Sequence, residues 1–369
     1  MAHRRIIRFG LLGAGLVAPF HAKGIQASEG CELVAVADVV AERVQPMASR
    51  FGCKAYSSLD QLLGDESIDV INVLTPNHLH RDTVIAAAQS GKHVLVEKPP
   101  AMSLKDTDDM IAACRYAGVK LGIALTCRVR KGVQALRQAV VENRFGRILQ
   151  ADAYMKWYRS SQYYMSDDWR SQRRSGAGVT IQQAFHYIDL LVYLAGPVRS
   201  VEARMRNVMH PEVDLEDTLV CLMDYDSGAQ GIVSASTAFW PGTDMRIEIN
   251  GENGAGVISG ERMQTWKFRD ERPEDEPIRQ LGRTAVSTGA TGPADFDFAD
   301  HQTVIAGMAR AIREDTDPLI TVDCARHSLE VALAMYQSAA SGRPVALPMT
   351  DESKVWPQAS TQGVSYVGS

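Results

Sequence analysis

Short apolar runs alternate with longer segments of helical period over the first third of the chain, and no other feature limits the possible folds as strongly. The runs are rich in β-branched residues, which favour strands, and the alternation is typical of βαβ units with a parallel sheet. The expected strands are Ile6–Leu12, Glu32–Asp38, Ile68–Thr75, His93–Glu97 and Lys120–Leu125, and the expected helices are Val17–Ser28, Ala41–Phe51, Leu79–Ser90 and Leu104–Ala117. Residues 1–126 are therefore expected to form a doubly wound α/β domain.

The pattern changes after residue 126. We expect a helix over Gly132–Glu142, a strand over Ile148–Tyr158 and one helix over Val179–Leu194. Strands separated by turn signals follow, at Arg199–Val208, Leu215–Tyr225, Ala229–Ala238, Met245–Asn250 and Ala255–Ser259; then come a loop over 269–296, helices at Asp297–Glu314 and Ala325–Ser341, and a polar tail from Asp351. Consecutive strands with tight turns predict a mostly antiparallel sheet, so residues 127–369 are expected to form an α+β domain.

Length and charge agree with this division into two domains. A chain of 369 residues exceeds the roughly 250–300 residues at which single cores stop growing. The 44 acidic residues outnumber the 39 basic ones, and no long basic run is present. These features argue against nucleic acid or an anionic membrane as a partner and favour a small-molecule ligand.

The six cysteines, at positions 31, 53, 114, 127, 221 and 324, are scattered and form no CxxC pair. This spacing predicts a reducing compartment, the cytoplasm, and indicates no metal site. The apolar stretch Ile6–Ala18 follows two arginines and could be mistaken for a secretory signal, but Arg8 interrupts it. No stretch reaches the ~18 apolar residues of a membrane span.

A glycine motif, G-x-G-x-x-A, links the first expected strand to the first expected helix. It comprises Gly13, Ala14, Gly15, Leu16, Val17 and Ala18. Glycines allow a tight turn and close backbone approach, while the helix N-terminus presents unpaired N–H groups to a pyrophosphate. The motif alone is weak, and a plain strand-to-helix turn is the alternative, but its place between strand and helix predicts a Rossmann dinucleotide site.

Asp38 ends the second expected strand, 20 residues beyond Ala18. A carboxylate there can accept hydrogen bonds from the adenosine ribose hydroxyls and repels the 2′-phosphate of NADP, so NAD is the expected cofactor. Val39 and Val40 offer that phosphate no cation. Arg43 lies one turn into the next helix, where it could reach the adenine or a phosphate or simply face solvent.

Three further segments carry a recognisable pattern. They are Thr75-Pro76-Asn77-His78-Leu79-His80, Glu97-Lys98-Pro99, and the stretch from Gly178 through His186 to Asp189. With the glycine motif and the closing segment from Asp317 to Pro344, they resemble the Gfo/Idh/MocA family of glucose-fructose oxidoreductase and inositol dehydrogenase. The resemblance implies a Rossmann domain followed by an open-faced sheet, a homodimer or homotetramer built through that sheet, and reversible oxidation of a secondary hydroxyl in a sugar, cyclitol or sugar derivative.

The resemblance also implies residue roles. Thr75, Pro76, Asn77 and His80 match positions that line the dinucleotide, Glu97 matches a position near the nicotinamide ribose, and Lys98 matches the active-site lysine. The chemistry fits, because ligands of open α/β sheets bind beyond the carboxyl ends of the strands, where Thr75 and Lys98 fall. Oxidising an alcohol needs a base close by, and a buried lysine of lowered pKa can serve. The alternative is a lysine held by Glu97 in a salt bridge.

Gln182, His186 and Asp189 are spaced i, i+4 and i+7, which places them on one face of the expected helix. A lone buried histidine is usually a satisfied core group, but the resemblance pairs His186 with Lys98 in proton transfer. An aspartate often stands where this chain has Gln182, and an amide cannot stabilise an imidazolium by charge. Which of Lys98 and His186 is the base stays open, and we expect Asp189 to form a structural pair.

The expected substrate contacts come from the start of the second domain. Arg128 matches a family arginine, although Cys127 replaces the usual polar neighbour. Tyr158, Trp169 and Arg170 belong to a stretch rich in aromatic and cationic side chains, suited to stacking on sugars and binding hydroxyls or a carboxylate. An ordinary packed loop or an oligomer contact would explain the same composition.

Three functions therefore compete. The leading hypothesis is an NAD-dependent sugar dehydrogenase in which Lys98 and His186 manage the proton. The second is a nucleotide-sugar dehydrogenase acting at the sugar C3 hydroxyl, since some family members with an uncharged residue at the Gln182 position do this, or an enzyme that keeps its nucleotide bound. The third is a sensor that binds dinucleotide without turnover, which would have no need of a proton relay.

Overall fold

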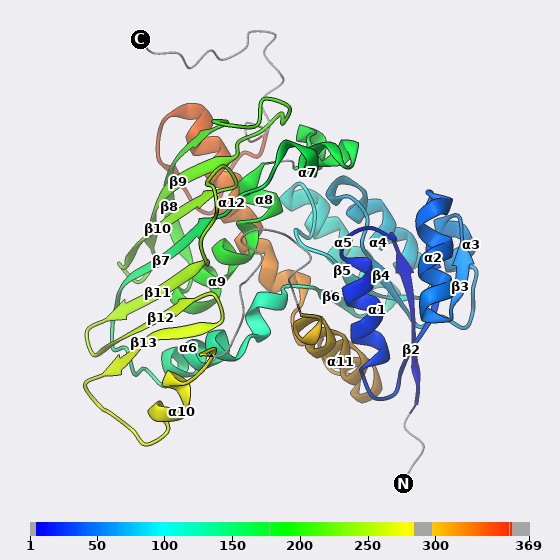
Figure 1. The fold of residues 1–369 in the computed structure, drawn as a ribbon, viewed down its shortest axis with the longest axis horizontal. Helices are drawn as coiled ribbons and strands as arrows, with labels where there is room; N and C mark the ends of the chain where they lie inside the picture. The colour runs from blue at the N-terminus through cyan, green and yellow to red at the C-terminus, as the bar shows by residue number, and fades with distance from the viewer. Residues whose placement is uncertain (1–4, 177, 284–296, 354, 356–369) are drawn as a thin grey trace.

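The computed structural model describes residues 5–176, 178–283, 297–353 and 355. Two sheets stand on opposite sides of the molecule, with helices α11 (Ala299–Glu314) and α12 (Val322–Ser341) between them (Figure 1). The sequence-predicted architecture is confirmed: a parallel α/β sheet is followed by a larger, mostly antiparallel one.

The first sheet has six parallel strands in the order β3-β2-β1-β4-β5-β6. The strands are β1 (Ile7–Leu12), β2 (Cys31–Ala37), β3 (Lys54–Tyr56), β4 (Val70–Val73), β5 (His93–Val96) and β6 (Leu121–Ile123). The helices are α1 (Ala18–Gln26), α2 (Ala41–Phe51), α3 (Leu59–Leu63), α4 (His80–Gln89) and α5 (Leu104–Ala117), with the 3-10 turn η1 at Asn77–Leu79. The prediction missed β3 and α3, because three and five residues are too few to show a period.

The second sheet has eight strands in the order β13-β12-β11-β7-β10-β9-β8-β14, antiparallel except for the β10 and β7 pair. They are β7 (Ile148–Lys156), β8 (Val198–Arg206), β9 (Thr218–Tyr225), β10 (Gln230–Ser236), β11 (Arg246–Gly251), β12 (Gly254–Ser259), β13 (Arg262–Phe268) and β14 (Val345–Ala346). Helices α9 (Phe185–Ala195) and α12 cover the face that looks toward the first sheet, and α6 (Lys131–Val141) packs near its lower end (Figure 1).

The segment from residue 157 to 176, expected to be irregular, contains short helical turns. These are α7 (Ser161–Met165), η3 (Asp168–Arg170) and η4 (Arg173–Ser175); a fourth 3-10 turn, η2 (Thr126–Val129), precedes α6. Of these turns, η4 contacts η1 of the first half and η2 contacts α11.

The helix expected over Val179–Leu194 is interrupted. α8 (Val179–Gln182) ends where the Ala184 N–H donates to the Val179 carbonyl, 2.8 Å away and five residues back, and α9 starts at Phe185. This wider turn breaks the regular helical spacing between α8 and α9. The prediction that Gln182 and His186 lie one regular turn apart on a continuous helix is therefore wrong.

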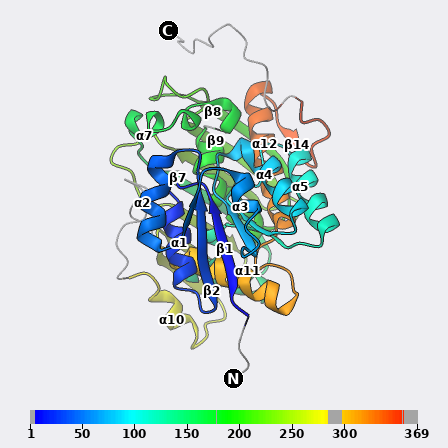
Figure 2. The same cartoon turned by 90° about the vertical axis from the view of Figure 1, so that its right-hand side faces the viewer.

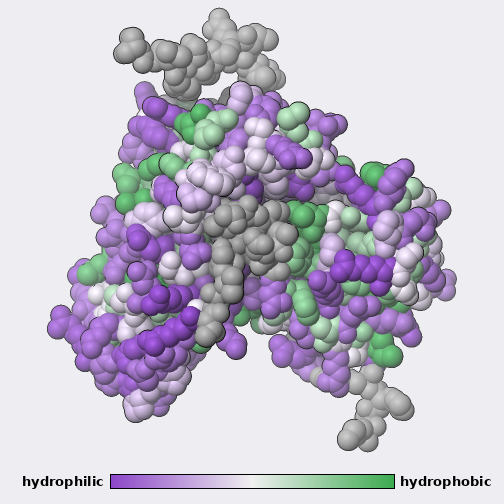
Figure 3. Space-filling view, in the orientation of Figure 1, coloured by the Kyte–Doolittle hydropathy of each residue, from purple (hydrophilic) through white to green (hydrophobic). Residues whose placement is uncertain are grey.

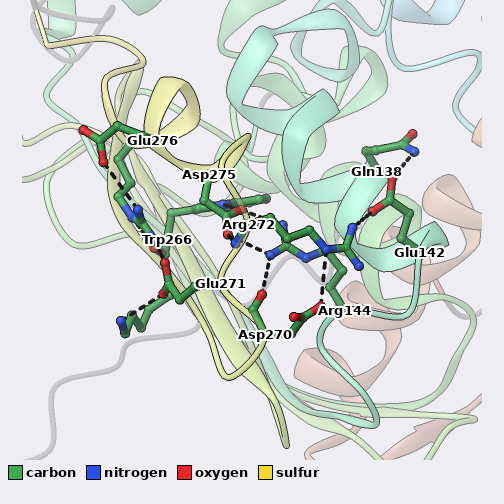
Figure 4. A network of polar contacts seen from close by, with 11 residues as sticks. Gln138, Glu142, Arg144, Trp266, Asp270, Glu271, Arg272, Asp275 and Glu276 are labelled. Atoms are coloured by element: carbon green, nitrogen blue, oxygen red, sulfur yellow. Dashed lines mark hydrogen bonds and ion pairs between the residues drawn. The ribbon is translucent and has the colours of Figure 1, made fainter.

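The loop expected over 269–296 is partly structured. Residues 284–296 lie outside the described residues, but α10 (Asp275–Arg279) folds back against β13, a strand that the prediction missed. The Asp275 carboxylate accepts hydrogen bonds from Trp266 Nε1 at 2.6 Å and from both terminal nitrogens of Arg144 (Figure 4). A buried carboxylate with these partners fixes the position of α10.

Helix α11 comes late in the chain but packs against α1 of the first domain, as Figures 1 and 2 both show. The contact is close: a Cβ on Gly24 of α1 would lie 3.0 Å from the Gln302 backbone nitrogen of α11. Gln302 Nε2 also donates to the Ala27 carbonyl at 2.7 Å, and Arg313 to the Gly30 carbonyl at 2.6 Å. Residues assigned by sequence to the second domain thus complete the packing of the first.

Hydrophilic side chains predominate on the face shown in Figure 3, with hydrophobic ones scattered among them. In the described part of the chain, no helix has both the length and the apolar character needed to cross a membrane.

Candidate active site

A cavity of about 450 Å³ lies between the two halves, at the carboxyl ends of the first sheet's strands. It brings together most of the residues predicted from the sequence. Those that line it are Gly13, Gly15, Leu16, Val17, Asp38, Arg43, Thr75, Pro76, Asn77, Glu97, Lys98, Trp169, Arg170, Gln182 and His186. Ala14, His80, Arg128 and Tyr158 do not line it.

The glycine turn has the geometry that a bound phosphate requires. Gly13 has φ +105, and a Cβ there would lie 2.7 Å from the Leu74 carbonyl oxygen, so only glycine fits. A Cβ on Gly15 would meet no heavy atom within 4 Å, because that position faces open space. The N-cap residue of α1, Val17, makes no side-chain cap; Ala18 donates its N–H to the Gly15 carbonyl at 3.1 Å and Phe20 donates to the Val17 carbonyl at 3.1 Å, so the helix contributes the positive end of its dipole to a ligand there.

Asp38 follows β2 and lines the cavity, where two backbone N–H groups hold its carboxylate. One carboxylate oxygen accepts from the Ala14 N–H at 2.8 Å and the other from the Val40 N–H at 2.9 Å. Ala14 therefore supports Asp38 through its backbone instead of facing the cavity. Each carboxylate oxygen has a second lone pair, which can accept a hydrogen bond from a ribose hydroxyl.

His80 is fully buried and supports the loops around the cavity. Its Nδ1 lies 2.9 Å from the Pro99 carbonyl oxygen and its Nε2 lies 3.0 Å from that of Thr75. A neutral imidazole carries one N–H, so His80 donates to one of these carbonyls and packs between the loop after β4 and the loop after β5. Burial lowers the pKa of His80, against the opposing effect of these two carbonyls.

Glu97 follows β5 and is fixed by a chain of hydrogen bonds. His21 Nε2 lies 2.9 Å from Glu97 Oε1, and Asn72 Nδ2 donates to His21 Nδ1 at 3.0 Å. Burial disfavours the charged carboxylate, but the hydrogen bond with His21 and the nearby positive charges outweigh it and lower the pKa of Glu97 to about 2. Glu97 is therefore ionised at neutral pH.

Lys98 extends across the gap between the two halves. Its Nζ donates to the backbone carbonyl of Gln182 in α8. Burial lowers the pKa of Lys98, and the charge of Arg170 adds to this, whereas Glu97 raises it. The ammonium is thus easier to deprotonate than an exposed lysine would be.

His186 lies close enough to Lys98 for their charges to interact. Burial, followed by the positive charge of Lys98, lowers the pKa of His186 well below its usual value, so the imidazole is neutral at neutral pH. Its Nδ1 is buried without a hydrogen-bond partner among the described residues. The Gln182 side chain does not orient this ring: its Nε2 donates to the Arg170 carbonyl at 3.0 Å.

Arg128 and Tyr158, predicted to contact substrate, lie elsewhere. Arg128 forms two hydrogen bonds to Asp189, at 2.7 and 2.6 Å, in a buried ion pair, because a buried carboxylate on α9 needs a cation. Tyr158 pairs by a backbone bridge with Ala238 and packs its ring edge-on against Trp240. The structural pairing expected of Asp189 is confirmed.

Several residues that line the cavity were not identified from the sequence. They are Thr126, Cys127, Arg130, Trp157, Arg159, Tyr163, Asp167, Gln183, Tyr187, Asp297, Asp300 and His301. Trp157, Arg159 and Tyr163 belong to the aromatic and cationic stretch that was singled out, so the signal was present there. Asp300 and His301 come from α11, and no local pattern marks them.

Polar atoms buried without a partner concentrate at this cavity. Among the described residues, they include Thr75 Oγ1, Trp157 Nε1, Gln183 Oε1, His186 Nδ1 and His301 Nδ1, all on side chains that line it. Leaving a buried polar group unpaired costs roughly 1–3 kcal/mol. A polar ligand that supplies the missing partners would remove this cost.

One group of side chains in the described part of the chain has the spacing of metal ligands: His21, Glu97 and His301, whose ligand atoms lie within 4.8 Å of one another. His21 is poorly suited to this role. Its Nδ1 accepts a hydrogen bond from Asn72, so its Nε2 carries the hydrogen and donates a hydrogen bond to Glu97. That arrangement leaves His21 no lone pair for a metal and makes it a support for the carboxylate.

Comparisons with known proteins agree with this geometry. Residues 7–125 match the profile described as "Oxidoreductase family, NAD-binding Rossmann fold", and residues 133–257 match the "GFO/IDH/MocA C-terminal domain". The chain is 30% identical over 343 residues to 1,5-anhydro-D-fructose reductase of Ensifer adhaerens, covering 91% of this chain and 97% of that protein. It is 26% identical to scyllo-inositol 2-dehydrogenase (NAD(+)) of Bacillus subtilis (strain 168), covering 92% and 96%.

A solved structure is similar over nearly the whole chain. It is the WlbA dehydrogenase from Bordetella pertussis in complex with NADH and UDP-GlcNAcA, at a TM-score of 0.85 and 31% identity, covering 94% of this chain and 99% of that one. The similarity spans both sheets and the cavity between them.

We predict that substitution by alanine has different effects at the two glycines of the turn. Gly15→Ala should leave the thermal unfolding temperature unchanged, because its Cβ meets nothing in the protein, and should weaken NADH binding on the order of tenfold or more by occupying the space before α1. Titration of NADH fluorescence measures this.

Gly13→Ala serves as the comparison. It should lower the unfolding temperature, because of its positive φ and the clash with Leu74. If Gly15→Ala binds NADH as tightly as the wild type, the dinucleotide does not lie over this turn.

Proposed function

The chain belongs to the Gfo/Idh/MocA oxidoreductase family, and on this basis we propose that it oxidises a secondary hydroxyl of a sugar or sugar derivative reversibly, with Lys98 and His186 handling the proton. The observation that carries the proposal is the place of Lys98: buried, of lowered pKa, and beside His186 in a cavity lined by both halves of the chain. A sensor without turnover would not need this pair.

NAD, when bound, supplies the acceptor for the hydride at its nicotinamide ring. The glycine turn, Asp38 and the loop at Thr75–Asn77 provide the surface that binds it, and the unpaired Thr75 Oγ1 is one of the atoms that such a ligand would satisfy. As the hydride leaves the substrate carbon, the hydroxyl proton must pass to a base, giving carbonyl product, NADH and one proton.

We propose Lys98 as that base and His186 as the group that orients the hydroxyl. His186 is the poorer proton acceptor, because burial and the charge of Lys98 both destabilise its imidazolium. Its unpartnered Nδ1 is free to hydrogen-bond the substrate. The Gln182 carbonyl holds the Lys98 amine in place, so Gln182 contributes through its backbone where other chains have a carboxylate.

Two features support NAD over NADP. Asp38 presents a fixed carboxylate to the ribose end of the cavity, and Val39 and Val40 beside it supply no cation to bind a 2′-phosphate. The related scyllo-inositol 2-dehydrogenase is named for NAD(+).

A nucleotide sugar bearing a carboxylate is the second candidate substrate. The similar WlbA structure holds UDP-GlcNAcA, and in this chain Arg159 and Arg170 both line the cavity and flank the Tyr163 ring, at 5.7 and 4.9 Å from its centroid. Guanidinium groups bind carboxylates well. Oxidation at the sugar C3 hydroxyl would leave the roles of Lys98 and His186 unchanged.

A spectrophotometric screen with NAD and a panel of sugars, cyclitols, sugar acids and nucleotide sugars tests the function. We expect NADH formation with one class, reduced on the order of 10²–10⁴-fold in kcat by Lys98→Met, because the base is lost. NADH affinity should change little. Lys105→Met, which alters an exposed lysine on α5, should behave as the wild type. No turnover across the panel despite tight NADH binding would favour the sensor or a bound-cofactor enzyme.

The pH profile of kcat separates the two possible bases in the same experiment. Only the neutral amine accepts a proton, so the rate of oxidation should rise with pH up to the lowered pKa of Lys98 and then level off. His186→Asn should lower the rate but keep this limb, whereas Lys98→Met should lose it. The reverse pattern would make His186 the base.

We infer a homodimer or homotetramer that associates through the second sheet. On β9, Leu219, Cys221 and Met223 face the helices and are buried, whereas Val220 and Leu222 point to the opposite face and are 48% and 56% exposed. We place the contact at this apolar pair, because exposed apolar surface favours association.

Leu222→Asp should therefore reduce the mass measured by light scattering to that of one chain, since a buried unpaired charge opposes association. Glu202→Asp, a conservative change on the neighbouring strand β8, should leave the mass unchanged. A wild-type protein that is already monomeric would contradict the inference.

We also infer that the protein works in a reducing compartment, the cytoplasm, because all six cysteines are free thiols. Thiol titration of the unfolded protein, purified without reductant, should find six thiols per chain. A smaller number would indicate disulfide formation and contradict the inference.

A further inference from the structure

An ion pair joins the two halves of the chain across the cavity. Arg43, one turn into α2, contacts Asp167, which directly precedes η3 in the second half. Both residues line the cavity, and Asp167 is the more buried of the two: 40% of the Arg43 side chain and 18% of the Asp167 side chain are accessible. The pair lies at the Asp38 end, since the charge of Asp38 acts on Arg43.

Arg43 is the group that would be expected to bind the 2′-phosphate of NADP. In Rossmann domains an arginine close after the second strand accommodates this phosphate. Among the described residues of the first half that line the cavity, the cations are Arg43 and Lys98, and Lys98 is bound to Gln182 in the other half. Arg43 is therefore the cation that the described residues of the first half place near Asp38.

Asp167 forms the ion pair with Arg43 and is itself held in place by Arg170. One of its carboxylate oxygens contacts Arg43, and the other accepts from Arg170 Nε at 3.2 Å. The Arg170 N–H also donates to the Asp167 carbonyl at 3.0 Å. With both oxygens committed, the carboxylate stays beside Arg43 and adds a second negative charge near Asp38.

We propose that Asp167, contributed by the substrate half of the chain, is a second determinant of cofactor choice that excludes NADP by neutralising Arg43. The inference rests on the proposed preference for NAD. It differs from the role of Asp38, which repels the 2′-phosphate directly, because Asp167 acts by withholding the arginine that would bind that phosphate.

Binding of NADH and NADPH, followed by fluorescence without any sugar present, tests the proposal in full-length protein. Asp38→Ala removes the direct repulsion and provides the sensitive background. Adding Asp167→Asn should then tighten NADPH binding about tenfold or more, because a charge-assisted contact from Arg43 becomes available. NADH affinity should change less than about threefold, since NADH carries no phosphate at that position.

Two control variants isolate the effect. Asp168→Asn removes the same charge from the next, exposed residue and should leave both affinities unchanged. Adding Arg43→Gln to the Asp38→Ala, Asp167→Asn protein should abolish the gain in NADPH affinity.

Two results would overturn the proposal: no gain in NADPH affinity from Asp167→Asn, or a gain that survives Arg43→Gln. A wild-type protein that binds NADPH as tightly as NADH would instead refute the proposed NAD preference. The role proposed for Asp167 would then be refuted as well. Because no substrate is needed, the test does not depend on the identity of the sugar.

Discussion

The hydrogen bond from Lys98 to the Gln182 carbonyl connects the two halves of this protein at the place where the chemistry is proposed. Lys98 stands at the end of β5, and Gln182 closes α8 beside the second sheet. The bond forms only if both sheets are in place, since one partner comes from each. The pKa of Lys98 also depends on both halves. Burial lowers it, and neither sheet alone would enclose the amine.

The groups around this bond show how a polar cavity is kept stable. Glu97 is hydrogen-bonded to His21 and His21 to Asn72 Nδ2, and the neutral His80 ring donates to one of two loop carbonyls, so these side chains have partners within the protein. Other polar atoms, such as His186 Nδ1 and Thr75 Oγ1, have none. The satisfied groups hold the loops in position, and the unsatisfied ones are the atoms that a ligand can recognise.

Helix α11 shows that chain order and spatial order differ in this fold. It follows the second sheet in the sequence, yet it packs on α1 and brings Asp300 and His301 into the cavity. His301 meets His21 edge-on, with ring centroids 5.0 Å apart, and burial lowers its pKa to about 4. The first domain is thus closed by a segment distant in sequence, which ties the geometry of the dinucleotide site to the fold of the second half.

The sequence alone determined the fold class, the glycine turn, Asp38, and the placement of Thr75 and Lys98 at strand ends, because these depend on local periodicity and on the geometry of one strand-to-helix connection. It could not determine that α8 and α9 are separate, that Arg128 turns away to Asp189, or that Asp167 and His301 reach the cavity. Those outcomes depend on which buried charge finds which partner and on how closely two helices pack. Such contacts join residues far apart in the chain, so only the tertiary structure decides them.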